Sequence, residues 1–357
     1  MIWSYKKENK MFNKRIISIF VILLMVCSSV QVLAGGRKLG TAGAPELLIP
    51  MGAKSVGMAG ANIANIACTE AIYYNPAGLS LLENSEATFT YMTYFADMNV
   101  SYLTAGFSIG ELGKLGISLQ SLDIGEIEVT TIDVPEGTGE EIKPTYLTVG
   151  LTYAKSLTNR ISFGLNTKLI SEKIGNMSAS AVAWDFGIQY RSDANIDFGI
   201  ALKNIGSKIK FDGTGIEYDS EITYANPNAT TRKTKLDMAE HELPTSLQIG
   251  LAYRYNFSEM HKANIVSQFV NSSYSFDQWV SGIEYSWGDK IFLRGGYNLP
   301  FFPDAYSSDD KDDYQYGLHL GAGVKLPLGS NRLSIDYAYR EMELFEGNNY
   351  FTLGFEF

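Results

Sequence analysis

Three histidines are the first candidates for chemistry in the 357-residue sequence: His241, His261 and His319. A histidine works as a general base only when a nucleophile and an orienting group lie within hydrogen-bonding reach. The sequence carries no trace of such a nucleophile–base–orienter set. We therefore predict that the protein is not an enzyme, and a hydrolase built into a barrel is the disfavoured alternative.

Two further stretches have the composition of ligand-binding motifs without their spacing. The segment "SSDDKDDY" at 307–314 groups four aspartates, which can bind calcium, but it lacks the spacing and the glycine of a known calcium loop. The glycines of "GLHLGAGVKLPLG" follow the period of a strand, so a phosphate loop is disfavoured. We predict a solvated acidic loop, no metal and no cofactor.

Charged side chains recur at alternate positions within apolar segments. In "LSIDYAYR", Leu333 and Ile335 alternate with Ser334 and Asp336, and successive side chains of a strand point to opposite faces. The charges therefore share a face with Gly, Ala, Ser and Asn, as in a wet lumen, and a docked plug explains them as well as a solute path does. The predicted lumen charges are Lys168, Asp197, Lys203, Arg254, His319, Asp336 and Arg340, with His319 beside Arg340 if "GS" in "PLGSN" is a two-residue turn.

The elements that carry these charges are strands, and their number is even. The opposite face of each strand is apolar and ends in Tyr or Phe, which is typical of a lipid-facing wall with an aromatic girdle. We predict an all-β fold, a transmembrane antiparallel β-barrel of about fourteen strands. The expected strands are 85–94, 98–110, 114–127, 144–156, 160–173, 179–191, 195–211, 243–256, 261–271, 276–286, 290–298, 313–327, 331–343 and 348–357.

The lengths of the connections support a barrel in the outer membrane. Long connections at 128–143, 212–242 and 299–312 follow the third, seventh and eleventh strands, whereas connections after even strands are short. Outer-membrane barrels have short periplasmic turns and longer outside loops. If both chain ends are periplasmic, every long connection falls outside the cell.

The last strand, "NNYFTLGFEF", places bulky apolar groups at alternate positions up to its final residue. Phe351, Leu353, Phe355 and Phe357 are expected to face lipid, and the strand is expected to close the barrel against the first one. A terminal pattern of this kind, with Phe355 and Phe357, also resembles the signal read by the bacterial barrel-assembly machinery.

The N-terminus predicts export. Basic residues precede the apolar run "IISIFVILLMVCSSV", and Val32-x-Ala34 fits a cleavage site, so residues 1–34 are predicted to be a cleaved signal peptide rather than an anchor helix. Either Met1 or Met11 can be the start. Loss of the segment takes the net charge from −10 to about −14, which argues against nucleic acid. It also leaves one cysteine, Cys68, so no internal disulfide is possible.

Residues 35–83 do not alternate and are rich in Gly and Ala, while residues 84–357 form the predicted barrel. Small residues allow close packing, so the segment is either an arm under the barrel or a plug, here called the hatch, inside a lumen that would otherwise be open. In "YYNPAGLS", Asn75 can cap a new helix that begins at Pro76. Tyr73 and Tyr74 are candidates to line an apolar ligand pocket.

The stretches "GTAGA", "MGAKSVGMAGANIA" and "YYNPAGLS" resemble the opening of the PorV/PorQ family, which is similar to FadL-like outer-membrane proteins. The resemblance implies a fourteen-stranded barrel whose N-terminal hatch carries an Asn-Pro-Ala motif, matched here by Asn75, Pro76 and Ala77 and followed by Gly78. Acidic residues usually precede that motif, and here the stretch "IACTEAI" offers only Glu70. The motif is expected to have a structural or gating role.

The resemblance implies one of two functions. PorV-type members receive secreted cargo proteins at the cell surface in type IX secretion, which is the favoured interpretation. FadL-like members transport hydrophobic small molecules, such as fatty acids or aromatic compounds, across the outer membrane. The expected partners are outer-membrane lipid, the barrel-assembly machinery, and either a secreted protein or a hydrophobic small molecule. The barrel is expected to be monomeric.

Overall fold

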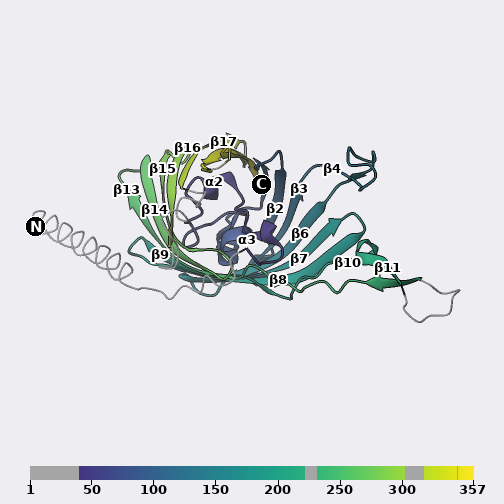
Figure 1. Cartoon of the computed structure of the whole chain (residues 1–357). Helices are drawn as coiled ribbons and strands as arrows, with labels where there is room; N and C mark the ends of the chain where they lie inside the picture. The colour runs from purple at the N-terminus through teal and green to yellow at the C-terminus, as the bar shows by residue number, and fades with distance from the viewer. Residues whose placement is uncertain (1–39, 222–230, 302–316, 344) are drawn as a thin grey trace, which may run out of the picture. The chain divides into compact units, whose positions relative to one another are not determined.

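The structure is a computed structural model that describes residues 40–221, 231–301, 317–343 and 345–357. Strands run side by side around a central space, and the N-terminal part of the described chain lies within that space (Figure 1). Residues 36–357 form one compact unit. Among the described residues, no helix is both long and apolar enough to cross a membrane.

Fourteen strands of the described chain form a closed antiparallel barrel, which confirms the predicted fold. Neighbours in sequence pair with each other, and the ring closes where the first strand pairs with the last, from Glu86↔Glu356 to Thr93↔Asn349. Closure leaves no unpaired edge in the hydrocarbon. The barrel strands are β1 (Glu86–Thr93), β2 (Asn99–Ser108), β3 (Lys114–Asp123), β6 (Thr145–Ser156), β7 (Ile161–Ile174), β8 (Met177–Arg191), β9 (Ile196–Gly206), β13 (Ser246–Asn256), β14 (His261–Ser272), β15 (Asp277–Trp287), β16 (Ile291–Phe301), β17 (Leu318–Leu328), β18 (Asn331–Arg340) and β19 (Asn348–Glu356).

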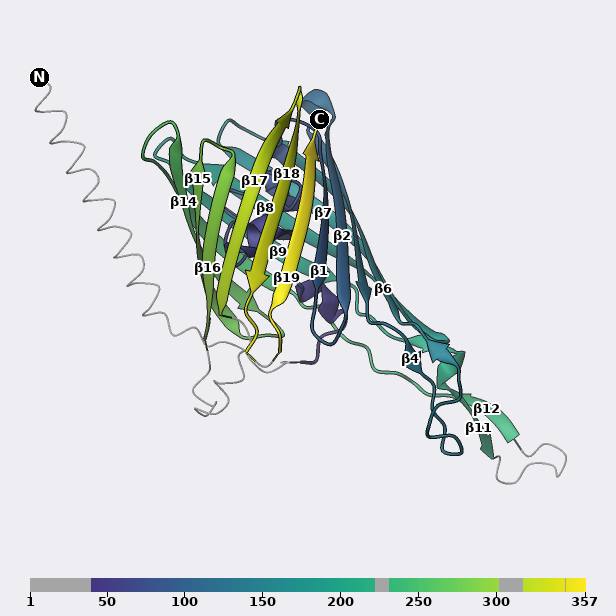
Figure 2. The same ribbon diagram turned by 90° about the horizontal axis from the view of Figure 1, so that it is seen from above.

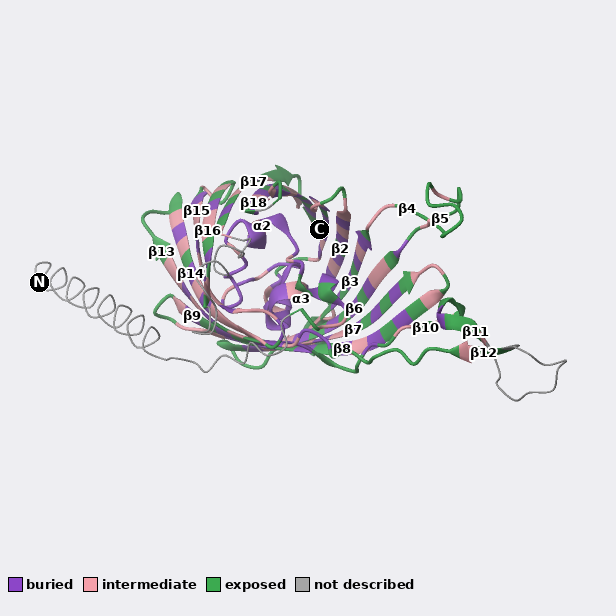
Figure 3. Ribbon diagram, in the orientation of Figure 1, coloured by how far each residue is buried: buried purple, intermediate pink, exposed green. Residues whose placement is uncertain are grey.

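Alternation of burial along each strand separates an apolar outer face from an inner face. On β19 the outward side chains of Phe351, Leu353 and Phe355 are exposed, whereas Tyr350 and Thr352 between them are buried. The same two-residue pattern colours the other strands (Figure 3). The apolar face is therefore the surface that a membrane would cover.

The long connections all begin at one end of the barrel. They follow β3, β9 and β16, the third, seventh and eleventh barrel strands, as the sequence predicts. We call this end the loop end and the opposite one the turn end. Two small strand pairs stand at the loop end, beyond the barrel strands (Figure 2): β4–β5 (Ile127–Glu128 and Glu141–Ile142) and β11–β12 (Glu217–Glu221 and Thr231–Lys235).

Three predicted strands extend too far, and two loops are more ordered than expected. The strands predicted at 114–127 and 331–343 end at Asp123 and Arg340, and the loop predicted at 128–143 contains β5. The seventh strand was predicted to extend to residue 211, but β9 ends at Gly206, where its pairing with β8 ends at Ala183↔Gly206. Its pairing with β13 already stops at Lys203↔Ser246. The chain then continues along β8, where β10 (Asp212–Gly213) pairs with Met177 and Ser178. The predicted loop 212–242 therefore contains β10, η5 (Thr214–Ile216), β11 and β12.

Candidate functional site between the hatch and the barrel wall

The hatch is built from short helical turns joined by Gly- and Ala-rich segments. Its turns are η2 (Pro45–Leu48), α2 (Ala53–Val56), α3 (Ala71–Tyr74) and η3 (Pro76–Leu81). None is long enough to be stable alone, so the hatch depends on packing inside the barrel. Its buried interior is visible at the centre of the ring (Figure 3).

Glycines on the inner face of the wall provide the space for the hatch backbone. A Cβ on Gly199 would lie 2.5 Å from the Ile63 carbonyl oxygen, and one on Gly282 would lie 2.6 Å from the Met58 carbonyl oxygen. Such approaches are too close for any side chain. The small residues that the sequence analysis assigned to a wet lumen thus serve mainly to seat the hatch. The wall glycines whose Cβ would collide with hatch backbone are Gly164, Gly199, Gly282 and Gly296. Those whose Cβ would lie closest to hatch side chains are Gly106, Gly116, Gly187 and Gly250.

The Asn-Pro-Ala motif is the point where the hatch meets β8 and β9. The Asn75 side chain caps η3 by accepting a hydrogen bond from the Ala77 amide at 3.2 Å, and Pro76 begins that turn, as predicted. The Asn75 Nδ2 donates to the Ile63 carbonyl at 2.8 Å and to the Ile188 carbonyl at 3.1 Å. One buried amide therefore joins two parts of the hatch to the wall.

The rest of the motif is packed too tightly for larger residues. Pro76, Ala77 and Gly78 are buried, and a Cβ on Gly78 would collide with the Ile66 carbonyl oxygen. Gly164 of the wall leaves room for the Pro76 backbone in the same way, and Gly187 leaves room for the side-chain oxygen of Asn75. The motif requires these residue types because backbone lies against backbone.

Glu70, the one acidic residue in the stretch just before the motif, organises the hatch itself. Its Oε2 accepts hydrogen bonds from the Ser55 amide, at 3.0 Å, and from the Ser55 hydroxyl. Asn62 Nδ2 donates to the same hydroxyl at 2.9 Å. Burial raises the pKa of Glu70 to about 7, and the bonds from Ser55 oppose that shift.

The hatch also spans the seam between the first and last strands. The Ala53 amide donates to Thr352 Oγ1 of β19 at 2.9 Å. On the other side of the seam, the Thr69 amide donates to Glu86 Oε2 of β1 at 2.9 Å. These bonds link the start of α2 and the approach to α3 to the two strands whose pairing closes the barrel.

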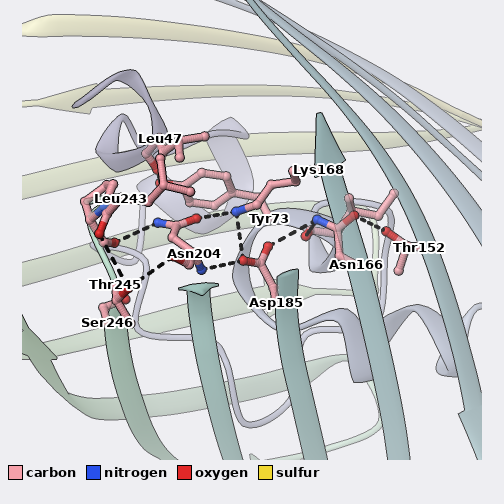
Figure 4. Close-up of polar contacts among 12 residues, drawn as sticks. Leu47, Tyr73, Thr152, Asn166, Lys168, Asp185, Asn204, Leu243, Thr245 and Ser246 are labelled. Atoms are coloured by element: carbon pink, nitrogen blue, oxygen red, sulfur yellow. Dashed lines mark hydrogen bonds and ion pairs between the residues drawn. The ribbon is translucent and has the colours of Figure 1, made fainter. Parts of the chain in front are cut away.

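A polar network marks the irregular junction of β8 and β9 (Figure 4). The register shifts between Trp184 and Phe186, and Asn204 adopts the left-handed conformation (φ 59°) opposite this point. The Asn204 amide donates to Asp185 Oδ1 at 2.8 Å, and its side-chain Nδ2 donates to the Pro244 carbonyl at 2.9 Å. Lys168, a predicted lumen charge, pairs with Asp185 at 2.8 Å and also bonds to Asn204.

Lys203 and the two tyrosines meet at the same junction. The Lys203 Nζ lies 3.7 Å from the centre of the Tyr73 ring, a cation–π geometry. Tyr73 and Tyr74 pack edge to face at 4.8 Å, and the Tyr73 hydroxyl donates to the Leu47 carbonyl at 3.1 Å. The two tyrosines thus contact the hatch and wall at this point.

The other predicted lumen charges are distributed along the inner wall. Arg254 pairs with Asp197 at 2.9 Å. His319 Nδ1 lies 3.0 Å from the Val56 carbonyl oxygen of the hatch, and His319 pairs in register with Arg340, as the hairpin turn predicted. Asp336 lies elsewhere, in an ion pair at 2.6 Å with a residue that the sequence analysis missed, Arg294.

Arg294 joins two carboxylates. Besides Asp336, it pairs with Glu284 at 2.7 Å. The sequence contained the signal for both Arg294 and Glu284, since each occupies an inward position of an expected strand. Asp185 also occupies an inward position of an expected strand and was likewise not predicted as a lumen charge.

A cavity of about 300 Å³ lies between the hatch and the turn end of the wall. Its lining carries five basic and five acidic side chains, and neither Tyr73 nor Tyr74 belongs to it. The lining is therefore of mixed charge rather than apolar. The charged members are Lys54, Arg191, Arg294, Lys325, Arg332, Glu70, Glu83, Glu86, Asp336 and Glu356.

Within the described residues, no three His, Cys, Asp or Glu side chains are grouped as metal ligands would be. The acidic stretch at 307–314 lies outside those residues. Cys68 is buried, and burial raises the pKa of its thiol to about 12.

Comparison with known proteins identifies relatives of both the sequence and the fold. The model of the family described as "Type IX secretion system protein PorV" matches residues 34–231, more than half of the chain. A search of curated protein sequences gave no match.

Several solved structures share the barrel. The CymD monoaromatic hydrocarbon channel has a TM-score of 0.53 and 12% identity, over 86% of this chain and 97% of that one. The Pseudomonas putida toluene transporter TodX has a TM-score of 0.52 and 14% identity, over 85% and 97%. A Pseudomonas aeruginosa FadL homologue has a TM-score of 0.51 and 11% identity, over the same shares. At these identities the likeness concerns the fold alone.

Proposed function

The chain belongs to the family of the type IX secretion system protein PorV, and from this premise we propose that it is a non-enzymatic outer-membrane barrel that receives secreted proteins at the cell surface. The barrel fold and the family imply an outer-membrane location. The proposal assigns the loop end to the cell surface and the turn end to the periplasm, since longer connections of such barrels lie outside.

The contacts of the hatch support a plugged barrel. Hatch residues approach wall glycines on strands around the ring, from Gly106 on β2 to Gly296 on β16, and bond to β1 and β19 at the seam. A general porin keeps an aqueous channel through its lumen. A barrel with its lumen filled by its own chain is better suited to handling specific cargo at its outer end.

The observation that carries the proposal is the ordered extension at the loop end. Between β9 and β13 the chain forms β10, η5 and the β11–β12 ribbon, so this connection presents structure beyond the barrel. In the ribbon an acidic strand pairs with a basic one, with Glu217 opposite Lys235 and Asp219 opposite Lys233. Tyr218 and Leu236 are exposed there, and exposed apolar side chains within a charged rim are typical of protein-binding surfaces.

Transport of a hydrophobic small molecule is the competing function. The solved channels and transporters share the fold with this chain, but the cavity beside the hatch is lined by charges of both signs. A hydrophobic ligand needs a mostly apolar pocket, because unpaired polar groups are costly to desolvate. Tyr73 and Tyr74, the candidates for such a pocket, instead pack against each other and Lys203.

The proposal is tested by gentle detergent purification followed by mass spectrometry of whatever co-purifies. A secreted protein with a C-terminal domain shared among several exported proteins would support it. A variant with Tyr218 and Leu236 changed to serine should keep the barrel and lose this partner. Bound lipid or fatty acid, without a protein partner and unchanged in the variant, would favour hydrophobic transport and contradict the proposal.

A further inference from the structure

Two carboxyl groups meet where the first turn of the hatch contacts the wall. Glu46 belongs to η2, and Glu172 lies on β7, two residues before the loop end of that strand. Their side chains are 3% and 4% exposed. Buried carboxylates normally have a cation or several donors as partners, because an isolated buried charge is expensive.

Among the described residues no cation pairs with either carboxyl, and the main-chain amide of Ala44 donates to the carboxyl of Glu172. Glu46 Oε1 and Oε2 and Glu172 Oε1 are buried and accept no hydrogen bond from any donor there. No described Lys, Arg or His forms an ion pair with either residue. Besides the main-chain amide of Glu46 itself, the group within hydrogen-bonding reach of the Glu46 carboxyl is the side-chain carboxyl of Glu172.

Two carboxyl groups can bond to each other only when a proton lies between them, as in a pair of acids that share one site. We propose that Glu46 and Glu172 form a proton-sharing latch that fastens the start of the hatch to the wall at the loop end. The latch holds while the pair keeps its proton, and it opens when both groups are charged.

The surroundings of Glu46 favour this arrangement. The titratable groups that face it from the wall are Glu172 of β7 and Tyr146 of β6. Tyr73 of α3 donates its hydroxyl to the carbonyl of the next residue, Leu47. From β3, Gln120 donates its Nε2 to the Glu46 main-chain carbonyl at 2.9 Å and so leaves the carboxyl free.

The latch lies at a junction of three parts of the protein. Leu47, next to Glu46, packs in an apolar cluster with Ile170 of β7 and Leu243 of the loop-end connection. A few residues earlier, the Gly43 amide donates to the Glu242 carbonyl at 3.0 Å, and His241 Nδ1 lies 3.3 Å from the Thr41 carbonyl oxygen. Opening the latch would therefore loosen the hatch from the wall and from the loop-end extension together.

The direction of the pH dependence follows from the burial. Burial and the neighbouring Glu172 raise the pKa of Glu46 above its ordinary value of 4.5. A carboxyl whose pKa is raised on docking binds its proton more tightly in the docked state, so docking is strongest at low pH and weakens as pH rises through the raised pKa. The latch is thus closed in acid and open in alkali.

The test is hydrogen exchange of the full-length protein in detergent, followed by mass spectrometry over residues 41–49. Protection factors, in which the intrinsic pH dependence of exchange is divided out, should fall at least about tenfold between about pH 6 and about pH 9. In Glu46→Gln the amide can donate to Glu172 without a titrating proton, so protection should persist at both pH values. Glu172→Gln makes the same test from the wall, and Glu128→Gln, on the exposed β4, should behave as wild type.

Three results would overturn the latch. Wild-type protection could be equal at both pH values, or both glutamine variants could lose protection with pH as wild type does. Protection that depends on added calcium or on a chelator at constant pH would mean that a cation joins the carboxylates instead of a proton. The latch does not rest on the proposed cargo role, because none of these measurements involves a partner.

Discussion

Adding one methyl group to the inner wall should release the middle of the hatch. A Cβ on Gly296 of β16 would lie 2.5 Å from the Met58 carbonyl carbon and 2.6 Å from the Ala59 amide nitrogen. Both atoms are backbone, so no side chain can rotate away. Gly295, the next residue, faces the outside, where a Cβ would meet nothing closer than 4.0 Å. Gly296→Ala and Gly295→Ala are therefore matched variants that differ in the face to which the methyl group points.

The magnitude follows from the geometry. Non-bonded carbon atoms rest about 3.5–4.0 Å apart, so the hatch backbone must retreat by roughly 1 Å. Overpacking of this kind costs about 1–3 kcal/mol. The penalty falls on hatch docking, because the barrel strand itself can accept alanine. The equilibrium between docked and released hatch should therefore shift by about 5- to 150-fold towards release.

Hydrogen exchange over the segment 58–64 measures this shift, and ion conductance in a planar bilayer measures its consequence. Gly296→Ala should lose protection in that segment and pass small ions more readily, while the strands keep theirs. Gly295→Ala should match wild type in both assays. If the two variants behave alike, the wall glycines do not seat the hatch and the reasoning is wrong.

Three further predictions address the wall, the terminus and the hatch. Arg294→Met should lower stability by about 3–5 kcal/mol in detergent unfolding, because it leaves the carboxylates of Glu284 and Asp336 buried without their cation. Phe357→Asp should reduce the heat-modifiable gel band of the folded barrel in outer-membrane fractions, whereas Phe357→Tyr should preserve it. Normal levels of the aspartate variant would contradict a lipid-facing end of the last strand. Because burial raises the pKa of Glu70 to about 7, wild-type stability should fall as pH rises from 4.5 to about 7, and in thermal unfolding Glu70→Gln should show a shallower fall over the same range.

The barrel could be predicted because the alternation of side chains within a strand identifies its two faces from neighbouring residues alone. Side-chain alternation assigned Phe351, Leu353 and Phe355 to the outer face, and the structure exposes all three. A two-residue turn at Gly329 and Ser330 sets the register of β17 and β18, which brings His319 opposite Arg340. Both relations involve residues that are close in the sequence, so the periodicity of apolar and polar side chains reveals them.

The contacts of the hatch could not be predicted because they are long-range. The sequence gives Asn75 as a helix cap, but not its bonds to the carbonyls of Ile63 and Ile188. The sequence shows glycines in the strands, but it does not show that a Cβ on Gly199 would collide with the carbonyl oxygen of Ile63. The bulge at Asn204 was missed as well, since a left-handed asparagine leaves little trace in a strand pattern.

The sequence does contain a charge pattern that indicates the ribbon at the loop end, where only a loop was predicted. The segments "EYDSE" and "TRKTK" have opposite charges at matching positions, and the structure pairs Glu217 with Lys235 and Asp219 with Lys233. Cross-strand charge pairs of this kind favour a ribbon over an irregular loop.

Site-specific photo-crosslinking in cells tests the proposed function most directly. A photoreactive amino acid at Tyr218, which is exposed on β11, samples the loop end, and one at Leu151, which is exposed on β6, samples the lipid-facing wall. The proposal predicts that position 218 captures a secreted protein that position 151 does not. The proposal would be contradicted if position 218 captured no secreted protein in cells that actively export such proteins.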